Sequence, residues 1–153
     1  MLKHYVQQLL PPTILHPGRH PRGPPQRLVA LRGNQVTDVM FATEDGQRFR
    51  EFGRLPSARG GHCLVVLNET SLFVAGGEDS LGRALRDAWI FSKTRAWARL
   101  PDIPAALGLK DFSCGKTLGP ETNNIEVVIA GGSAPRNVYI FDAVSMTWRF
   151  GRK

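Results

Sequence analysis

Two short stretches decide the fold predicted for this chain: residues 72–77 read LFVAGG, and residues 127–132 read VVIAGG. In both, apolar residues that favour β-strands run directly into a pair of glycines. Such glycines suit a loop that cradles a phosphate, and they equally suit a strand end where nearby backbone leaves no room for a side chain. The first interpretation points to an enzyme and the second to a scaffold.

The residues that follow each glycine pair also repeat. DAWIFSKTRAW at 87–97 and NVYIFDAVSMTW at 137–148 follow the two pairs, and DVMFATEDGQRF at 38–49 is a more distant copy. The central triplets of these copies, VMF, WIF and YIF, begin 50 residues apart each time. A fixed period of this length with strand-rich units indicates one supersecondary unit repeated along the chain.

Each clear copy is predicted to contain four short strands. Polar turns such as 68–71 and 92–95 separate the apolar runs, and short polar turns between such runs favour antiparallel hairpins. We therefore expect an all-β fold of antiparallel four-stranded units. The strands expected in the two copies are 62–67, 72–76, 87–91 and 96–100, then 112–117, 125–130, 137–142 and 147–150.

An ordered set of residues in these copies resembles the kelch repeat. The set is a double glycine ending the second strand, an aromatic residue in the third, and a tryptophan opening the fourth. The resemblance covers about residues 27–150 and implies that each copy is one four-stranded blade of a β-propeller. The positions that carry it are Gly76, Gly77, Trp89 and Trp97, then Gly131, Gly132, Tyr139 and Trp148.

The first copy departs from this pattern. It has Leu31 and Arg32 where the glycines should be, Met40 in place of the third-strand aromatic, and Phe49 in place of the tryptophan. Since a closed propeller uses about 4–8 blades, we expect an incomplete propeller, and we favour a fragment of a longer protein over self-assembly or an open array. The expected divisions are a Pro/Gly-rich basic arm at 1–26, a partial blade at 27–54, and blades at 55–101 and 102–153.

The charge of the chain does not predict a nucleic-acid site. The 153 residues carry a net charge of +7, with 20 basic and 13 acidic residues, and much of the excess lies in HPGRHPRGPPQR at 16–27. This segment indicates a disordered, solvated arm, because no aromatic or recognition-helix pattern accompanies the charge. No apolar run approaches the roughly 18 residues of a membrane span. We expect no membrane contact, and a cytoplasmic location by default.

The residues that suggest catalysis do not complete a site. Gly115-Lys116-Thr117 resembles the end of a phosphate-binding loop, but Lys110 stands where its first glycine is required and no helical pattern follows. His62 and Cys63 are adjacent on a predicted strand and should point to opposite faces. The chain has no cysteine or histidine spacing typical of a metal site. We expect no enzyme activity, no cofactor and no metal.

The two cysteines are expected to be free thiols. Cys63 and Cys114 lie 51 residues apart, at positions that match in the two copies. Packed sheets commonly lie about 10 Å apart, whereas a disulfide needs Cα atoms within roughly 7 Å. Between them, Asn68-Glu69-Thr70 forms a glycosylation sequon, which carries little weight without a secretory route.

The loops at one end of the units are the predicted recognition surface. Segments 55–61, 78–86, 102–111 and 133–136 should emerge together, and charged loop tips on a rigid sheet can bind a partner. The predicted function is non-catalytic protein–protein interaction with an unidentified partner. The resemblance implies substrate recognition in a cullin-based ubiquitin ligase; the alternative is a structural or actin-associated protein, and an enzyme is remote. The candidate partner-binding residues are Arg59, Glu78, Asp79, Arg83, Arg86, Lys110 and Arg136. Unpaired blades also allow self-association.

Overall fold

A computed structural model describes residues 28–31, 36–43, 48 and 50–151. The arm predicted at 1–26, and Arg32 and Phe49 of the first copy, lie outside the described residues. The described part is all-β and contains no helix. Its strands are β1 Leu28–Leu31, β2 Thr37–Thr43, β3 Arg50–Arg59, β4 Cys63–Asn68, β5 Ser71–Ala75, β6 Ala88–Ser92, β7 Ala96–Leu100, β8 Phe112–Leu118, β9 Ile125–Gly131, β10 Ala134–Asp142 and β11 Thr147–Phe150.

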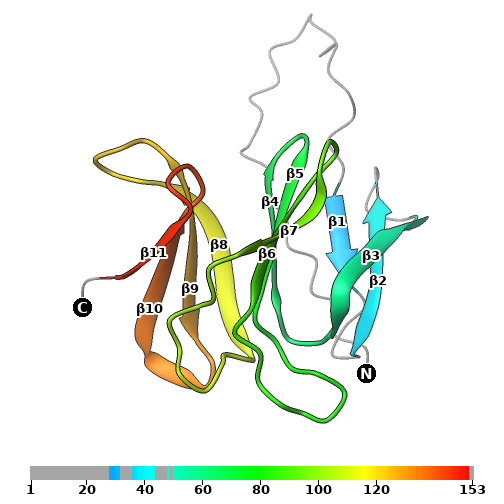
Figure 1. The fold of residues 1–153 in the computed structure, drawn as a ribbon, viewed down its shortest axis with the longest axis horizontal. Coiled ribbons are helices and arrows are strands. Elements are labelled where there is room, and N and C mark those ends of the chain that lie inside the picture. The colour runs from blue at the N-terminus through cyan, green and yellow to red at the C-terminus, as the bar shows by residue number, and fades with distance from the viewer. Residues whose placement is uncertain (1–27, 32–35, 44–47, 49, 152–153) are drawn as a thin grey trace, which may run out of the picture.

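The strands form three antiparallel sheets that stand side by side (Figure 1). The first contains β1, β2 and β3, and the other two contain β4–β7 and β8–β11 in sequential order. The predicted all-β class and the antiparallel four-stranded units are thereby confirmed. The described strands do not close into a ring (Figure 1).

Two of the expected loops are shorter than predicted. Strand β3 continues to Arg59, where its backbone pairs with Thr37, so most of the 55–61 segment belongs to a strand. Strand β10 begins at Ala134, opposite Gly131, which leaves a tight turn in place of the 133–136 loop. In both cases the pairing shifts register along the ladder, which lets the strand extend past the point where its apolar pattern stops.

Strands β4 and β5 of the middle sheet are buried on both faces. On one face Phe73 packs against Phe141 of the third sheet, with ring centroids 5.2 Å apart. On the other face Leu64 and Val74 pack in one cluster with Met40 of the first sheet. Strands covered on both sides need apolar residues at every position. This requirement accounts for the nearly continuous apolar runs of β4 and β5.

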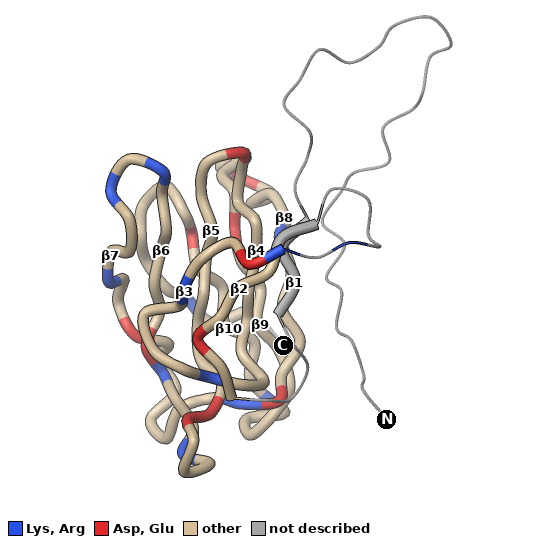
Figure 2. The backbone as a smooth tube through the Cα atoms, turned by 90° about the vertical axis from the view of Figure 1, so that its right-hand side faces the viewer, with Lys and Arg blue, Asp and Glu red and all other residues tan. Residues whose placement is uncertain are grey.

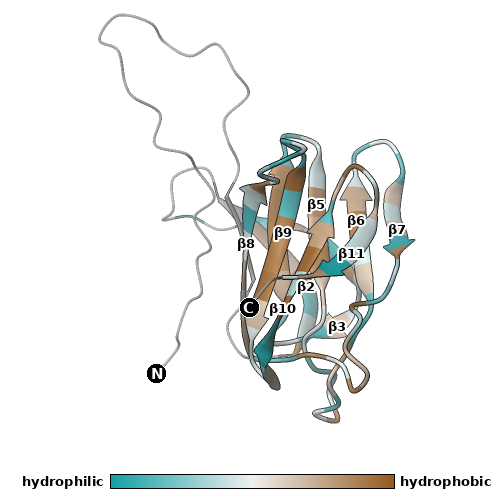
Figure 3. Cartoon of the chain, turned by 90° about the vertical axis from the view of Figure 1, so that its left-hand side faces the viewer, coloured by the Kyte–Doolittle hydropathy of each residue, from teal (hydrophilic) through white to brown (hydrophobic). Residues whose placement is uncertain are grey.

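The third sheet buries only one face against a neighbour among the described residues. Val127 and Ile129 face the middle sheet and are buried, whereas Val128 and Ile140, which pair with each other on the opposite face, are half-buried. The outward face of this sheet is turned to the viewer in Figure 3, where brown and teal segments alternate. Arg149 crosses this face and bonds both carboxylate oxygens of Glu126, at 2.8 and 2.9 Å.

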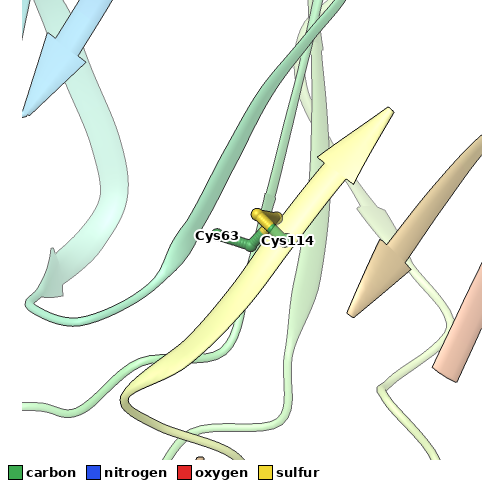
Figure 4. The surroundings of a disulfide bond; sticks show 2 residues. All are labelled: Cys63 and Cys114. Atoms are coloured by element: carbon green, nitrogen blue, oxygen red, sulfur yellow. A yellow bond between two sulfur atoms is a disulfide. The ribbon is translucent and has the colours of Figure 1, made fainter. Parts of the chain in front are cut away.

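The expectation of free thiols is wrong, because Cys63 and Cys114 form a disulfide with Cα atoms 5.8 Å apart (Figure 4). The two residues are not equivalent. Cys63 pairs with Ala75 of β5, and in the third sheet it is Ser113 that pairs with the corresponding Ala130. Cys114 is therefore displaced by one residue, and a displacement of one residue reverses the face to which a side chain points.

The two cysteines consequently face each other. Cys63 lies on the face of the middle sheet that turns to the third sheet, and Cys114 lies on the face of the third sheet that turns back. Strands β4 and β8 are the neighbouring strands of these sheets, and the seam between them is crossed by the disulfide (Figure 4). The average spacing of packed sheets does not apply at this seam, where the two strands converge.

Candidate protein-interaction site

The long connections of the two four-stranded sheets gather at one end of the molecule. Residues 76–87 join β5 to β6, residues 101–111 join β7 to β8, and the β9–β10 turn lies at the same end (Figure 1, bottom). We call this the loop end. The opposite end carries the short β4–β5, β6–β7 and β10–β11 turns together with the β8–β9 connection, and we call it the turn end.

The two long connections are bonded to each other along their backbones. The N–H of Ile103 donates to the carbonyl of Arg86 at 2.7 Å, and the N–H of Leu109 donates to that of Leu85 at 2.8 Å. Gly77 bonds to both connections, since its N–H donates to the carbonyl of Leu109 and its carbonyl accepts from the N–H of Leu85. Satisfied backbone groups of this kind fix loop conformations, so the loop end is a preorganised surface.

The glycine pairs lie where the strands end and the connections of the loop end begin. Gly76 has φ +63°, and a Cβ there would come within 2.8 Å of the Leu109 carbonyl oxygen. Gly77 has φ +94°, and a Cβ there would come within 2.7 Å of the His62 side chain. At Gly132 a Cβ would collide with the carbonyl of Lys110. Close approach of backbone and positive φ thus both account for glycine here.

Several charged side chains of the loop end are paired with one another. Lys110 Nζ lies 2.8 Å from Glu78 Oε2 and also donates to the Gly82 carbonyl at 3.3 Å. Arg83 Nε lies 2.7 Å from Asp79 Oδ2. The hydrogen bond from Lys110 to Glu78 raises the pKa of the lysine, and the backbone N–H of Arg83 is the main cause of the lowered pKa of Asp79.

Arg86 completes the pattern, because its Nε lies 3.1 Å from Asp102, which also accepts from Arg99 at 2.7 Å. Five of the predicted partner-binding residues therefore lie together at the loop end, with their charges compensated by neighbours. Arg136 is exposed near the start of β10. Basic and acidic segments are interleaved along the backbone, with both kinds at the loop end (Figure 2).

Arg59 is not on this surface, and its assignment as a partner-binding residue is corrected. Its side chain is fully buried, and its guanidinium donates to both carboxylate oxygens of Asp87, at 3.0 and 2.7 Å. It also donates to the carbonyl of Gly76 at 3.1 Å and to Ser57 Oγ at 2.7 Å. Because β3 ends beneath the glycine pair, this arginine links the first sheet to the middle one.

The carboxylate of Asp87 is held ionised at this position. Burial tends to raise its pKa, but hydrogen bonds from Arg59 and from Trp89 Nε1, the latter at 2.6 Å, outweigh burial and lower it. Trp89 in turn lies beneath the guanidinium of Arg99, 5.4 Å from the ring centroid. This arrangement supports the fold of the loop end and leaves Asp87 unavailable to a partner.

The tryptophans that open the fourth strands connect successive sheets. Trp97 Nε1 donates to the carbonyl of Arg54 in the first sheet at 2.7 Å. Trp148 Nε1 donates to the carbonyl of Pro101, just beyond the middle sheet, also at 2.7 Å. Tyr139 is buried in the seam between the middle and third sheets. The geometry gives these aromatic residues a packing role between units.

Sequence reasoning missed two apolar residues at the loop end. Leu107 is 91% exposed and Leu81 is 74% exposed, at the tips of the two bonded connections. Each is followed by a glycine with positive φ, Gly82 at +74° and Gly108 at +78°. A leucine-glycine pair inside a connection between strands is the sequence signal for these positions.

Within the described ranges, histidine, cysteine, aspartate and glutamate form no cluster suited to a metal ion. Among the same residues, none belongs to a helix with the length and apolar character needed to cross a bilayer.

Comparison with known proteins gives a partial similarity. No family model matches the chain. The chain is 30% identical over 80 residues to the F-box/kelch-repeat protein SKIP20 of Arabidopsis thaliana, a match that covers 52% of this chain and 19% of SKIP20. The chain thus matches about a fifth of that relative's length. The similarity hints at kelch-type repeats and is consistent with a protein-interaction module.

Proposed function

We propose that this chain is a non-catalytic module that binds a protein partner through the loop end. The observation that carries the proposal is the pair of exposed leucines, Leu81 and Leu107, held on two mutually bonded connections. The similarity to a protein named for its kelch repeats supports the same class of function.

The energetics of the surface favour binding through these leucines. Fully burying a leucine side chain contributes roughly 1.5–3 kcal/mol, and the ordered loops have little conformational entropy left to lose on association. The surrounding ion pairs would form a polar rim, which contributes little to affinity and excludes mismatched partners. We therefore assign the charged residues to loop order and specificity, and the leucines to affinity.

The non-catalytic character of the proposal has support from the residues that suggested chemistry. Gly115, Lys116 and Thr117 lie inside strand β8, and Lys116 Nζ donates to the Leu67 carbonyl of the middle sheet at 3.3 Å. The ring nitrogens of His62 are buried, and neither has a hydrogen-bond partner among the described residues.

Two kinds of partner follow from the resemblance. The first is a substrate of a cullin-based ubiquitin ligase, which the F-box/kelch name of the relative favours. The second is a cytoskeletal protein such as actin. Affinity capture with the full chain separates them, because cullin components would be recovered in the first case and actin in the second.

The site itself is tested with matched leucine variants. Leu81→Asp and Leu107→Asp place a charge at the loop end, whereas Leu118→Asp and Val144→Asp do so at exposed positions of the turn end. We expect the loop-end variants to lose captured partners and the turn-end variants to keep them, with unchanged circular dichroism for all four. Equal recovery with all four variants would refute the loop end as the binding site.

A further inference from the structure

The sequon Asn68-Glu69-Thr70 forms the turn between β4 and β5, and all three residues are exposed. Asn68 Oδ1 accepts hydrogen bonds from the backbone N–H of Thr70 at 2.9 Å and from its hydroxyl at 3.0 Å. The amide and the hydroxyl that define an N-glycosylation sequon are thus in direct contact on an accessible hairpin turn. The whole sequence contains no second Asn-x-Ser/Thr.

A second and independent observation concerns the redox environment. Cys63 and Cys114, the whole cysteine content of the chain, are joined in a disulfide. The bond crosses the seam between two sheets, and Cys63 is fully buried. Structural disulfides persist in secreted proteins and in the lumen of the endoplasmic reticulum, and they are rare where thiols are kept reduced.

We propose that Asn68 is a site of N-linked glycosylation and that this part of the protein folds in the oxidising lumen of the secretory pathway. The sequon supplies the acceptor, and the disulfide indicates the compartment in which acceptors are modified. This proposal replaces the cytoplasmic location expected from the sequence alone.

The two covalent steps balance with donors that this compartment supplies. The side-chain nitrogen of Asn68 forms a bond to the anomeric carbon of a lipid-diphosphate-linked oligosaccharide. The bond from that carbon to the diphosphate oxygen breaks, the lipid diphosphate leaves with the electron pair, and the nitrogen loses one proton. Cys63 and Cys114 lose two electrons and two protons to an oxidising protein disulfide, which becomes a dithiol.

The position of the glycan is compatible with partner binding. Asn68 lies at the turn end, and Leu81 and Leu107 lie at the loop end of the same sheet (Figure 1). An oligosaccharide on Asn68 would leave the leucines uncovered. A lumenal location excludes both cytosolic partners considered above, the cullin-based ligase and actin, and leaves the interaction module with a partner of the same compartment.

The test uses the natural full-length reading frame that encodes the chain, expressed in cultured animal cells with no added leader. Treatment with peptide-N-glycosidase should increase the electrophoretic mobility. Mass spectrometry should then find Asn68 converted to aspartate. Alkylation before and after reduction should label the two cysteines only after reduction.

Three variants assign the modification. Asn68→Gln and Thr70→Ala should reduce the mobility shift by the share of one glycan, and Thr70→Ser, which keeps the sequon, should retain the full shift. A wild-type protein whose Asn68 the glycosidase leaves unconverted would overturn the proposal, as would an Asn68→Gln variant that shows the full wild-type shift. Cysteines that alkylate fully without reduction would overturn the assignment of an oxidising compartment.

Discussion

The strands of the middle and third sheets pair in the same register, but the two sheets differ on the faces that point away from the first sheet. The register that places Ala75 opposite Cys63 and Ala130 opposite Ser113 also matches Val65 with Gly115 and Phe73 with Val128. In the middle sheet Val65 and Phe73 are fully buried. In the third sheet the matching residues are small or half-buried.

The repeated pattern thus determines where the strands lie, whereas the neighbours of a sheet determine which residues its faces carry. The face of the third sheet that turns away from the middle sheet also carries the ion pair of Glu126 and Arg149, where the middle sheet has Ser71 and Ala98. The comparison can be tested at four positions, in order of decreasing expected effect.

The largest expected effect comes from Phe73→Ala. The ring is fully buried and contacts Phe141 and Trp148, so its removal should cost about 3–5 kcal/mol of unfolding free energy. The matched change in the third sheet, Val128→Ala, should cost about 1 kcal/mol. Urea unfolding of the two variants measures both values. Equal losses would show that both sheets are covered alike.

Arg59→Ala should cause the next largest loss of unfolding free energy. It removes one partner of a buried ion pair and leaves Asp87 uncompensated, which typically costs about 3–5 kcal/mol. Arg149→Ala is the matched change on the outer face, where the arginine is 48% exposed. It should cost less, about 1–3 kcal/mol, because the arginine is half-exposed to water, although the buried Glu126 loses two hydrogen bonds. Thermal unfolding of both variants at neutral pH provides the comparison.

The disulfide closes a loop of 51 residues, so its reduction should lower the free energy of unfolding by about 2–4 kcal/mol. Wild-type protein should unfold at lower urea concentration with a thiol reductant than without it. The double variant Cys63→Ala, Cys114→Ala is the control and should show no effect of the reductant. A reductant effect on the control would assign the change to another cause.

The smallest effect is expected for His62→Phe, which copies Phe112 at the matching position of the third sheet. The ring nitrogens of His62 are buried, and its pKa is lowered from 6.5 to about 3, chiefly by burial and also by the charge of Arg59. The unfolded chain therefore binds a proton that the folded chain refuses. Stability from this group is complete above about pH 6.5 and is lost as the pH falls toward 3.

The variant should flatten that pH dependence and add about 1–3 kcal/mol at neutral pH, since it removes two buried nitrogens that have no partner among the described residues. Unfolding curves at several pH values between 7 and 4 measure both effects. The acid sensitivity that belongs to Asp87 should remain, because its lowered pKa is independent of the substitution. An unchanged pH profile would show that His62 is solvated.

Much of the fold was accessible from the sequence, because strand, turn and glycine signals are local. The strands near 72–76 and 125–130, and the tryptophans that begin the fourth strands, follow from such signals. The disulfide did not, since a spacing of 51 between cysteines looks like equivalence until the ladder register shows the offset of one residue.

The candidate site was predicted less well than the fold. Its position at the connections followed from the alternation of antiparallel strands. The burial of Arg59 did not, because it depends on β3 running past its apolar pattern to meet Asp87 from another sheet. Exposed leucines such as Leu107 also escape sequence reasoning, since apolar residues are assigned to the core by default.

The two indole hydrogen bonds give the chain a direction of assembly. Trp97 and Trp148 each donate to a carbonyl that lies 43 or 47 residues earlier in the chain. During synthesis that carbonyl has already left the ribosome when the tryptophan emerges. Each new sheet can thus dock on its predecessor as soon as its fourth strand appears, so that the nascent protein grows by successive additions without waiting for its C-terminus.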